Sequence, residues 1–519
     1  MHSMPLNIFR YAIFNVDALC QLANSLRFGR WCTCDVTQVP VGGSLYWAVF
    51  VLFDDGVEWV FRSPRYDSTI RSAETIQKLV ASEAATLRYI NSHSAIPVPE
   101  VYAYSCSKNN SVGVPYILMS KAKGSPLSTK WNSRGSQKSA LSLKEKAKVL
   151  SQLGSITWQL SQLRFEEIGS LFEEGDGHFQ VGSCLSRGLV DFDRDSLNEL
   201  PRGPFSCENE YVDALVSAFL QHTECLQLHH HCFFAPLPTR KRYDDDREYR
   251  RACEQWNNFI TLGSKIDGSG NRTDYVIVGH SLRAIASKWT MKGVTAGPQH
   301  TNLEFALHHP DLNVNNIFVD DDCRITCIID WAFCSSVPLS VLLMAPGLPQ
   351  SRDELEAPLI AAFEDGLSKS ISTGDTILSK LRGFPSHRFL WLFYRLVSFD
   401  SSGDYSQFEE IWRLSDQNNL DFSTFFQSQQ RSDSYIKKHE EMKQDDEPVD
   451  CVMRREAAYF QRDMVGLTVS RKLTLVSEWT SRYRKNDNKG IRRSGSIFVA
   501  DDRLWKWILR SLEQAEGLE

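Results

Sequence analysis

The chain has 519 residues and a mass of 59.2 kDa, which is enough for two or three lobes with substantial cores. Hydrophobic residues make up 42% and charged residues 24%, a balance that excludes a wholly disordered chain. The net charge of −6 does not favour nucleic-acid binding, which needs clustered positive charge. The 13 cysteines include no Cys-x-x-Cys pair, and the longest apolar stretch, Leu45 to Phe53, is far below membrane-spanning length. We therefore expect reduced thiols, a cytoplasmic location and no membrane span.

The first third of the chain is predicted to form strands and one helix. Leu45 to Phe53 is rich in aromatic and β-branched residues, and Asp54-Asp55-Gly56 is a turn signal ahead of a second strand at Val57 to Arg62. Arg71 to Ile90 has helical periodicity. Glu83 falls on the apolar face of this helix, so it needs either a cationic partner or a wet cleft.

Further along the chain, helices and polar segments alternate. Pro115 to Met119 is expected to be a strand, Ser125 to Leu141 a loop and Leu143 to Leu163 a helix. The middle of the chain, about 169–298, is expected to alternate loops with charged helices such as Tyr243 to Phe259, and the chain beyond Asp353 to be mainly helical. The sequence also predicts an exposed loop or weakly ordered linker at Gln427 to Asp450 and a terminal helix at Leu504 to Leu509.

The most informative stretch runs from Leu307 to Trp331. Ile317 to Val319 and Arg324 to Ile329 read as a hairpin around an acidic turn, which places Asp330 at the end of a buried strand. Asp311 and Asn316 lie on the loop that enters the hairpin, so folding brings Asp330 back toward them.

These three side chains have the chemistry of phosphoryl transfer. Mg²⁺ prefers a few protein oxygens together with phosphate oxygens and water, and Asn316 and Asp330 can supply protein oxygens. Asp311 is then left to accept a hydroxyl proton, as in the catalytic loop of kinases. The alternative is that both residues have purely structural roles, with Asp311 capping a turn and Asp330 ending a strand. The joint spacing of the three residues favours the functional interpretation.

The sequence combines the motif His-x-Asp-x-x-x-x-Asn with a predicted hairpin and then Ile-Ile-Asp. This order and spacing resemble those of the aminoglycoside phosphotransferase and choline-kinase-like family, in its divergent fungal-type branch. The resemblance implies an α+β, protein-kinase-like fold with a small β-rich N-lobe and a larger, mainly helical C-lobe. It divides the chain into a nucleotide-binding lobe at 1–120, a catalytic and substrate lobe at 121–420 with an insertion around 170–298, and a polar linker with a helical extension at 421–519.

The resemblance also implies roles for individual residues. Asp311 matches the catalytic base, His309 supports its loop, and Asn316 and Asp330 match the magnesium ligands. Pro310 replaces the usual Gly of the His-Gly-Asp motif. Trp331 stands where protein kinases have the Phe of Asp-Phe-Gly.

The nucleotide would lie against the N-terminal strands. Gly42, Gly43 and Ser44 resemble the turn that covers the phosphates, although a plain turn explains these residues equally well. Arg62 stands where the family commonly has a phosphate-binding Lys, and Glu83 where the helix Glu pairs with it. Backbone groups of Met119, Ser120 and Lys121 would bind the nucleobase, while a simple core strand is equally compatible with this composition.

The function expected from this resemblance is transfer of the γ-phosphoryl group of ATP, or of GTP, to a hydroxyl of a small molecule with Mg²⁺. The alternative is a kinase-like regulatory module without efficient transfer, which Arg62 and the short Gly turn favour. Nothing in the sequence identifies the acceptor or an oligomeric state. Two further motifs are weak: His229 to Cys232 lacks a second metal-ligand cluster, and Gly279-His280-Ser281-Leu282-Arg283 lacks the second Gly of a hydrolase nucleophile elbow. Ser281 is therefore expected to be a helix cap or a loop residue.

Overall fold

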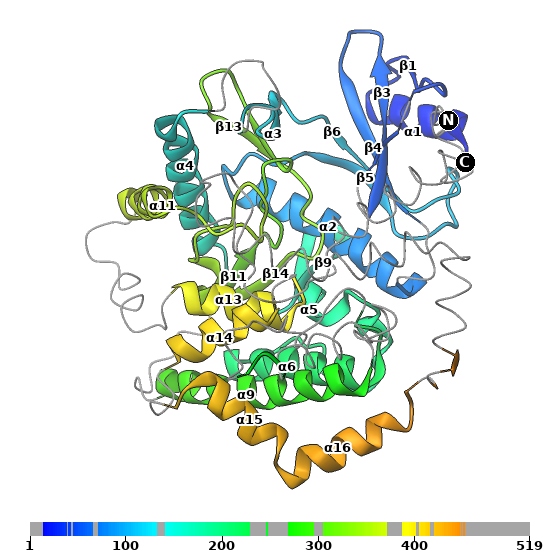
Figure 1. Cartoon of the computed structure of the whole chain (residues 1–519). Helices are drawn as coiled ribbons and strands as arrows, with labels where there is room; N and C mark the ends of the chain where they lie inside the picture. The colour runs from blue at the N-terminus through cyan, green and yellow to red at the C-terminus, as the bar shows by residue number, and fades with distance from the viewer. Residues whose placement is uncertain are drawn as a thin grey trace, which may run out of the picture. The chain divides into compact units, whose positions relative to one another are not determined.

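The structure is a computed structural model (Figure 1). It describes residues 14–38, 40–42, 45–65, 71–131, 141–228, 245–247, 268–294, 305–370, 387–400, 404–415, 420–446, 448 and 450–451. The chain forms two compact units, one of residues 1–214 with 292–387 and one of residues 215–291 with 388–519. Small antiparallel sheets and many helices confirm the predicted α+β class. The division at residues 120 and 420 stays a prediction.

A six-stranded antiparallel sheet begins the first unit, in the order β1-β3-β4-β6-β5 with β2 paired to β3 (Figure 1). Gly56 has φ +81° in the turn between β3 and β4, a conformation that glycine adopts without steric cost. The three strands predicted in this region are confirmed. The strands are β1 (Cys32–Thr33), β2 (Val41–Gly42), β3 (Tyr46–Phe53), β4 (Glu58–Pro64), β5 (Val101–Ser105) and β6 (Tyr116–Ser120).

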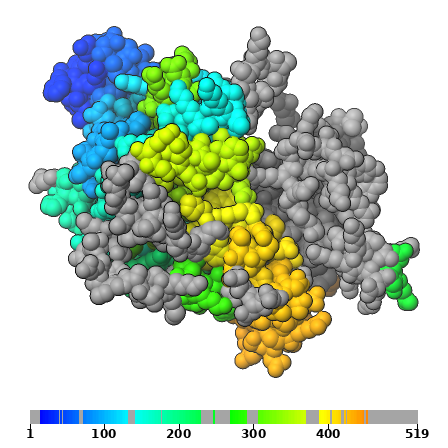
Figure 2. Space-filling view, turned by 90° about the vertical axis from the view of Figure 1, so that its left-hand side faces the viewer, coloured from blue at the N-terminus to red at the C-terminus, as the bar shows by residue number. Residues whose placement is uncertain are grey.

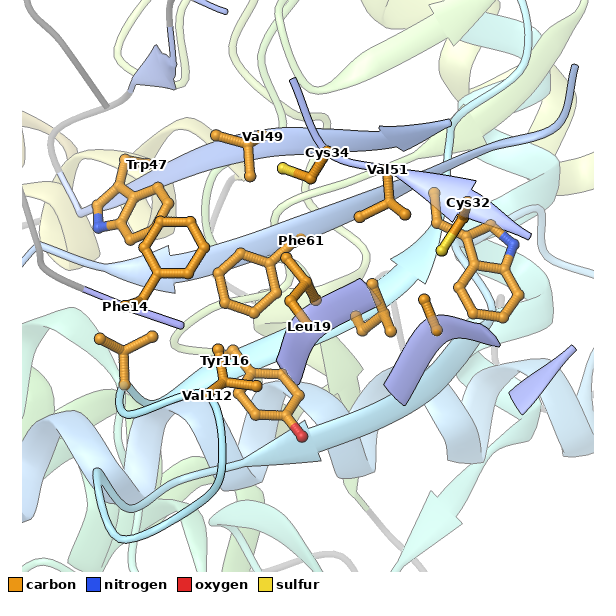
Figure 3. Packing of buried hydrophobic residues seen from close by; sticks show 14 of the residues in the cluster. Phe14, Leu19, Cys32, Cys34, Trp47, Val49, Val51, Phe61, Val112 and Tyr116 are labelled. Carbon is orange, nitrogen blue, oxygen red and sulfur yellow. The ribbon is translucent and has the colours of Figure 1, made fainter. Parts of the chain in front are cut away.

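An aromatic core lies on one face of this sheet, against α1 (Val16–Leu26) (Figure 3). The ring of Phe14 stacks on that of Phe61, with their centroids 5.4 Å apart, and lies 5.4 Å from the ring of Trp47. Successive side chains of a strand point to opposite faces. Because Phe61 points into this core, Arg62 points to the other face of the sheet.

The helix α2 (Ala73–His93) confirms the predicted helix at 71–90. Its N-cap residue, Ser72, accepts a hydrogen bond from the backbone N–H of Thr75 at 3.2 Å, which satisfies one of the free donors of the first turn. The predicted apolar face is buried, and Glu83 is buried with it.

Three small antiparallel sheets complete the strands of the first unit. The first sheet joins β7 (Ser125–Pro126), β12 (Ile317–Val319) and β13 (Ile325–Ile328). The second joins β8 (Arg164–Phe165), β11 (Phe305–His308) and β14 (Ser335–Pro338). The third joins β9 (Ser170–Glu174) and β10 (His178–Gly182). The predicted hairpin at 317–329 is thus confirmed. The segment Ser125 to Leu141, predicted to be a loop, instead begins with β7 and α3 (Ser128–Trp131), because β7 pairs with β12.

The helices α4 (Leu143–Gln162) and α11 (Ala357–Ser370) pack closely together, and Figure 2 shows them side by side in cyan and yellow-green. A capping box between Ser142 and Glu145 begins α4, as predicted within one residue. Close packing requires two glycines: a Cβ at Gly154 would lie 2.1 Å from the carbonyl oxygen of Phe363, and a Cβ at Gly366 would lie 1.9 Å from that of Ser151.

The second unit is helical over its described residues. Its helices are most of α6 (Glu208–Cys225), α9 (Ser269–Val294), α13 (His387–Val397), α14 (Asp404–Leu414), α15 (Phe422–Gln430) and α16 (Asp433–Lys443). Ser281 lies within α9, where its hydroxyl donates to the Ile277 carbonyl at 2.7 Å, so the expectation of a cap or loop residue was wrong. A continuous helix also contains no strand-to-helix nucleophile elbow.

The polar run Gln427 to Asp450 was predicted to be a loop or linker, and this prediction was wrong because α15 and α16 occupy most of it. Phe422 and Phe426 bury one side of α15, with the Phe422 ring 5.6 Å from that of Phe408. Helix α16 has no buried residue and holds Lys438 2.9 Å from Glu224 of α6. A helix on the surface can be polar nearly all round, which hides the apolar periodicity on which prediction depends.

Several predicted features lie outside the described residues: Gly43, Ser44, His229 to Cys232, most of Tyr243 to Phe259, and Leu504 to Leu509. Within the part of the chain that the structure describes, no helix is both long and apolar enough to cross a membrane.

Candidate active site

Arg62 of β4 and Glu83 of α2 form a buried ion pair. Arg62 Nη1 lies 2.7 Å from Glu83 Oε1, and the two residues are 8% and 1% exposed. The Arg62 guanidinium also lies over the ring of Tyr46, 3.8 Å from its centroid, as in a cation–π contact. This pair supplies the cationic partner that a carboxylate on the apolar face of α2 requires.

The charges of this pair depend on burial and on neighbouring carboxylates. Burial, assisted by the nearby Asp330 carboxylate, raises the pKa of Glu83 to about 7 even beside Arg62. Burial disfavours the charge of Arg62, but Glu83 and Asp330 outweigh it and raise the pKa of the guanidinium. Arg62 therefore stays cationic at neutral pH.

Asp330 follows β13 and binds the second terminal nitrogen of Arg62. Its φ of +66° is unusual for a residue with a side chain and re-aims the carboxylate at the end of the strand. Burial opposes ionisation of Asp330, but the adjacent Arg62 charge lowers its pKa, so the carboxylate is ionised at neutral pH. Its side chain remains 35% exposed and can meet a ligand.

The loop that carries Asp311 is organised by His309. The backbone N–H of Asp311 donates to His309 Nδ1 at 3.2 Å, and His309 Nε2 lies 3.0 Å from the carbonyl oxygen of Ile329. This arrangement requires a neutral ring with its proton on Nε2, and burial lowers the pKa of His309 accordingly. His309 thus connects the Asp311 loop to the residue before Asp330, and its ring meets the edge of Trp331 at 4.7 Å.

Asn316 lies at the other end of this loop. The side-chain Nδ2 of Asn316 donates to the backbone carbonyl oxygen of Asp311 at 3.0 Å. The backbone carbonyl oxygen of Asn316 accepts from the backbone N–H of Ile329 at 2.9 Å. The hairpin pairing of Ile317 with Ile328 therefore brings Asn316 next to the backbone that leads into Asp330.

The donor set of Asn316 and Asp330 fits Mg²⁺. Because the Asn316 amide nitrogen is bonded within the loop, its oxygen is the atom left for a cation. Asp330 adds a partly exposed, ionised carboxylate. Hard cations prefer such oxygens and complete their coordination with water and phosphate.

Side chains of α3 and α4 bind the β12–β13 hairpin. The Gln152 side chain donates to the carbonyl oxygen of Cys323 at 2.8 Å and accepts from the backbone N–H of Ile325 at 2.9 Å. Lys130 Nζ donates to the carbonyl oxygen of Asp320 at 3.0 Å, and Lys148 Nζ donates to that of Asp322 at 2.5 Å. These bonds fix the turn of the hairpin whose second strand leads to Asp330.

Sequence reasoning missed Arg187, which begins α5 (Arg187–Val190). Arg187 Nη2 lies 3.1 Å from Asp311 Oδ2, and its guanidinium lies 5.4 Å from the centre of the Phe333 ring. Arg71, just before α2, lies over the same ring at 5.4 Å and binds Asp191. No local motif marks these residues, because 124 positions separate Arg187 from Asp311.

Among the described residues expected at the nucleobase and phosphates, Gly42, Met119 and Ser120 lie on strands of the six-stranded sheet, and Lys121 directly follows β6. Met119 pairs with Val60 on one side and Val101 on the other, and the backbone N–H of Ser120 donates to the Glu100 carbonyl at 2.8 Å. The Lys121 ammonium binds Glu58. A Cβ at Gly42 would lie 2.5 Å from Arg65 Nη2, so this glycine lets a cationic side chain come close to the backbone of the Gly-rich segment.

Comparisons with known proteins give partial sequence matches. No family model matches the chain. A subtelomeric hrmA-associated cluster protein of Aspergillus fumigatus is 33% identical over 181 residues, which are 33% of this chain and 33% of that protein. Altered inheritance of mitochondria protein 9 of Debaryomyces hansenii is 29% identical over 126 residues, 24% of this chain and 20% of that protein. The chain thus matches only a third or less of the length of these curated relatives.

The solved structures that match the chain include two kinases and a phosphotransferase. A putative fructosamine-3-kinase from Thermobifida fusca has a TM-score of 0.38 at 14% identity, covering 77% of this chain and 98% of that one. A macrolide 2′-phosphotransferase from Brachybacterium faecium has a TM-score of 0.33 at 15% identity, covering 78% and 99%. An ethanolamine kinase from Plasmodium vivax has a TM-score of 0.34 at 11% identity, covering 78% and 84%. At these TM-scores, function has to be inferred from the site geometry.

Proposed function

We propose that the chain is an ATP- and Mg²⁺-dependent phosphotransferase that transfers the γ-phosphoryl group to a hydroxyl of a small molecule, as in the aminoglycoside phosphotransferase and choline-kinase-like family. The observation that carries this proposal is the contact of Arg62 with both Glu83 and Asp330. Kinase-like enzymes need a cationic strand residue paired with a helix Glu, together with a metal-binding Asp at the same place.

Each residue has one task in the proposed reaction. Asp311 orients the acceptor hydroxyl and accepts its proton as the acceptor oxygen forms a bond to the γ-phosphorus, while the bond from that phosphorus to the β–γ bridging oxygen breaks and releases ADP. His309 holds the Asp311 loop. Asn316 and Asp330 would hold Mg²⁺, which neutralises phosphate charge when bound.

The nucleotide would be held from the six-stranded sheet. Arg62 would grip phosphate oxygens while Glu83 orients it, and Gly42, Gly43 and Ser44 would cover the phosphates. Met119, Ser120 and Lys121 would lie along the nucleobase. Since the Ser120 N–H donates to the Glu100 carbonyl and the Ser120 hydroxyl accepts from the Glu100 N–H at 2.9 Å, the backbone from Lys121 onward is better placed for this contact.

Acceptor-dependent ADP formation tests the proposal. Asp311→Asn should lower turnover by about 10²–10⁴-fold, the range for a positioned general base, while nucleotide binding survives. Asp330→Asn should abolish the Mg²⁺-dependent part of the thermal shift caused by ATP or GTP. Asp321→Asn is the matched control, because this residue lies in the turn of the same hairpin with a fully exposed side chain and should leave turnover unchanged. Undiminished turnover in Asp311→Asn would sink the assignment.

A nucleotide-binding regulatory module is the second candidate, and the contact of Arg62 with Asp330 favours it. In this contact the Arg62 guanidinium binds the carboxylate that is proposed as a metal ligand. Such a module would show a nucleotide-dependent thermal shift without acceptor-dependent ADP formation. Slow ATP hydrolysis alone fits both candidates, so acceptor dependence decides between them.

We also propose a cytoplasmic location, on the basis of the reduced-thiol composition. The printed name of the yeast relatives contains the word mitochondrial, and their match covers about a fifth of their length. Imaging the tagged natural protein beside a mitochondrial marker distinguishes the two locations.

A further inference from the structure

Arg187 places a positive charge directly beside the proposed catalytic base. Its Nη2 lies 3.1 Å from Asp311 Oδ2, its guanidinium lies over the Phe333 ring, and its side chain is 33% exposed. A cation at this point is not needed to hold the Asp311 loop, because His309, Asn313 and Asn316 already bond the backbone of Asp311.

The backbone that carries Arg187 is fixed. The carbonyl oxygen of Gly188 accepts from buried Arg194 at 2.6 Å, and that of Leu189 accepts from Arg202 at 2.5 Å. Both of these α5 residues are buried. The Arg187 side chain therefore extends toward Asp311 from a backbone that is held on both of the following residues.

Asp191 is a second carboxylate near Arg187, but Arg71 binds it more closely than Arg187 does. Asp191 binds Arg71 through Nε at 3.1 Å and through Nη2, whereas Arg187 Nε lies 3.9 Å from Asp191. Asp191 therefore neutralises mainly Arg71. The charge of Arg187 faces the catalytic carboxylate.

An acceptor bound for transfer must place its hydroxyl oxygen about 2.6–3.2 Å from the Asp311 carboxylate. The atoms next to that hydroxyl then come within reach of Arg187, which contacts the same carboxylate. A carboxylate or phosphate group there can form two parallel hydrogen bonds with the planar guanidinium. An ammonium group there would meet a like charge.

We propose that Arg187 recognises an anionic group, a carboxylate or a phosphate ester, adjacent to the hydroxyl of the acceptor. This inference rests on the proposed phosphotransferase function and adds the chemical class of its substrate. It predicts that hydroxy acids or phosphorylated polyols are used in preference to neutral polyols and amino alcohols.

Two sets of matched acceptors test the inference with the full-length protein. One set is D-glycerate, glycerol and 3-amino-1,2-propanediol, and the other is glucose 6-phosphate, glucose and glucosamine. The first set tests the carboxylate and the second tests the phosphate ester. ADP formation gives kcat and KM, and melting temperatures are measured with each acceptor in the presence of Mg²⁺ and a non-hydrolysable ATP analogue.

Wild type should favour the anionic member of at least one set by about 10–100-fold in kcat/KM, the range for one strong charge-assisted contact. Arg187→Gln should lose that preference, mainly through KM, and Arg187→Lys should recover part of it. Arg88→Gln is the matched control: Arg88 is 32% exposed, lies 2.7 Å from Glu173 and stacks over Tyr104 at 5.1 Å. This variant should keep the wild-type preference.

Three results would overturn the inference: equal or preferred use of the neutral and amino members, an equal loss for all acceptors in Arg187→Gln, or loss of the preference in Arg88→Gln. An equal loss would mean that Arg187 serves the transferred phosphoryl group. If no acceptor yields ADP, the phosphotransferase proposal fails separately. In that case the melting temperatures test whether Arg187 binds an anionic acceptor. The anionic members alone should raise the melting temperature of wild type, and they should not raise that of Arg187→Gln. If they do not stabilise wild type, the inference is overturned.

Discussion

The guanidinium of Arg62 binds the carboxylate of Asp330, which lies 268 positions later in the chain. Its other terminal nitrogen binds Glu83. One side chain therefore connects β4, α2 and the segment that follows β13. Lys has a single nitrogen and lacks this planar fork, so Arg62 is not interchangeable with Lys at this position.

Removal of Arg62 should be costly because it leaves Glu83 buried without its cation. Arg62→Met should lower the free energy of unfolding by about 3–5 kcal/mol, and Arg62→Lys by about 1–3 kcal/mol. Urea denaturation at pH 7.5 measures both changes. Adding Glu83→Gln to Arg62→Met should recover part of the loss, since the uncompensated carboxylate is then gone. Strictly additive effects of the two substitutions would show that the pair does not interact.

Asp274 on α9 should make stability fall as pH rises. Burial raises the pKa of Asp274 to about 7, although Gln430 donates to it at 2.8 Å. Between its ordinary pKa and about 7 the folded state holds a proton that the unfolded state has lost, so stability decreases with pH in that window. Asp274→Asn removes this ionisation and its effect on stability. The free energy of unfolding of the variant minus that of wild type should therefore be roughly 3 kcal/mol larger at pH 8 than at pH 5. A difference that is the same at both pH values would contradict this prediction.

Gln152 should matter for both stability and turnover. Gln152→Ala leaves the Cys323 carbonyl and the Ile325 N–H without this partner, which should cost about 1–3 kcal/mol. Turnover should also fall, because the loosened hairpin carries Asp330. Gln162→Ala serves as the control in the same helix, since this side chain is exposed and its amide bonds the neighbouring Ser161 hydroxyl at 3.1 Å. It should change stability by less than about 0.5 kcal/mol. Chemical denaturation and ADP formation are the two measurements.

Gly366→Ala should destabilise the protein strongly, even though Ala favours a helix by about 1 kcal/mol over Gly. The added Cβ would meet the Ser151 carbonyl oxygen at 1.9 Å and force α4 and α11 apart. We expect a loss of about 3 kcal/mol or more, as for severe overpacking. Gly270→Ala in α9 is the matched control, because nothing lies within 4 Å of its Cβ position. Equal effects of the two substitutions in thermal melting would contradict the role of close helix packing.

Elements whose residues interact with near neighbours could be predicted from the amino-acid sequence. The alternation of β3, the turn at Gly56, the apolar face of α2 and the β12–β13 hairpin all follow from periodicity and turn chemistry. The His309 to Asp330 spacing identified a coherent candidate site because hairpin pairing is local. The buried position of Glu83 likewise implied that a partner would be needed.

Contacts between side chains that are distant in the sequence could not be predicted in this way. The contacts of Arg62 with Asp330 and of Arg187 with Asp311 depend on the path of the chain between them, and no local pattern encodes that path. The helical structure of Gln427 to Asp450 was also missed, because this run is polar and α16 has no buried residue. Side-chain periodicity specifies local elements, whereas the position of Arg187 beside Asp311 is set by long-range packing.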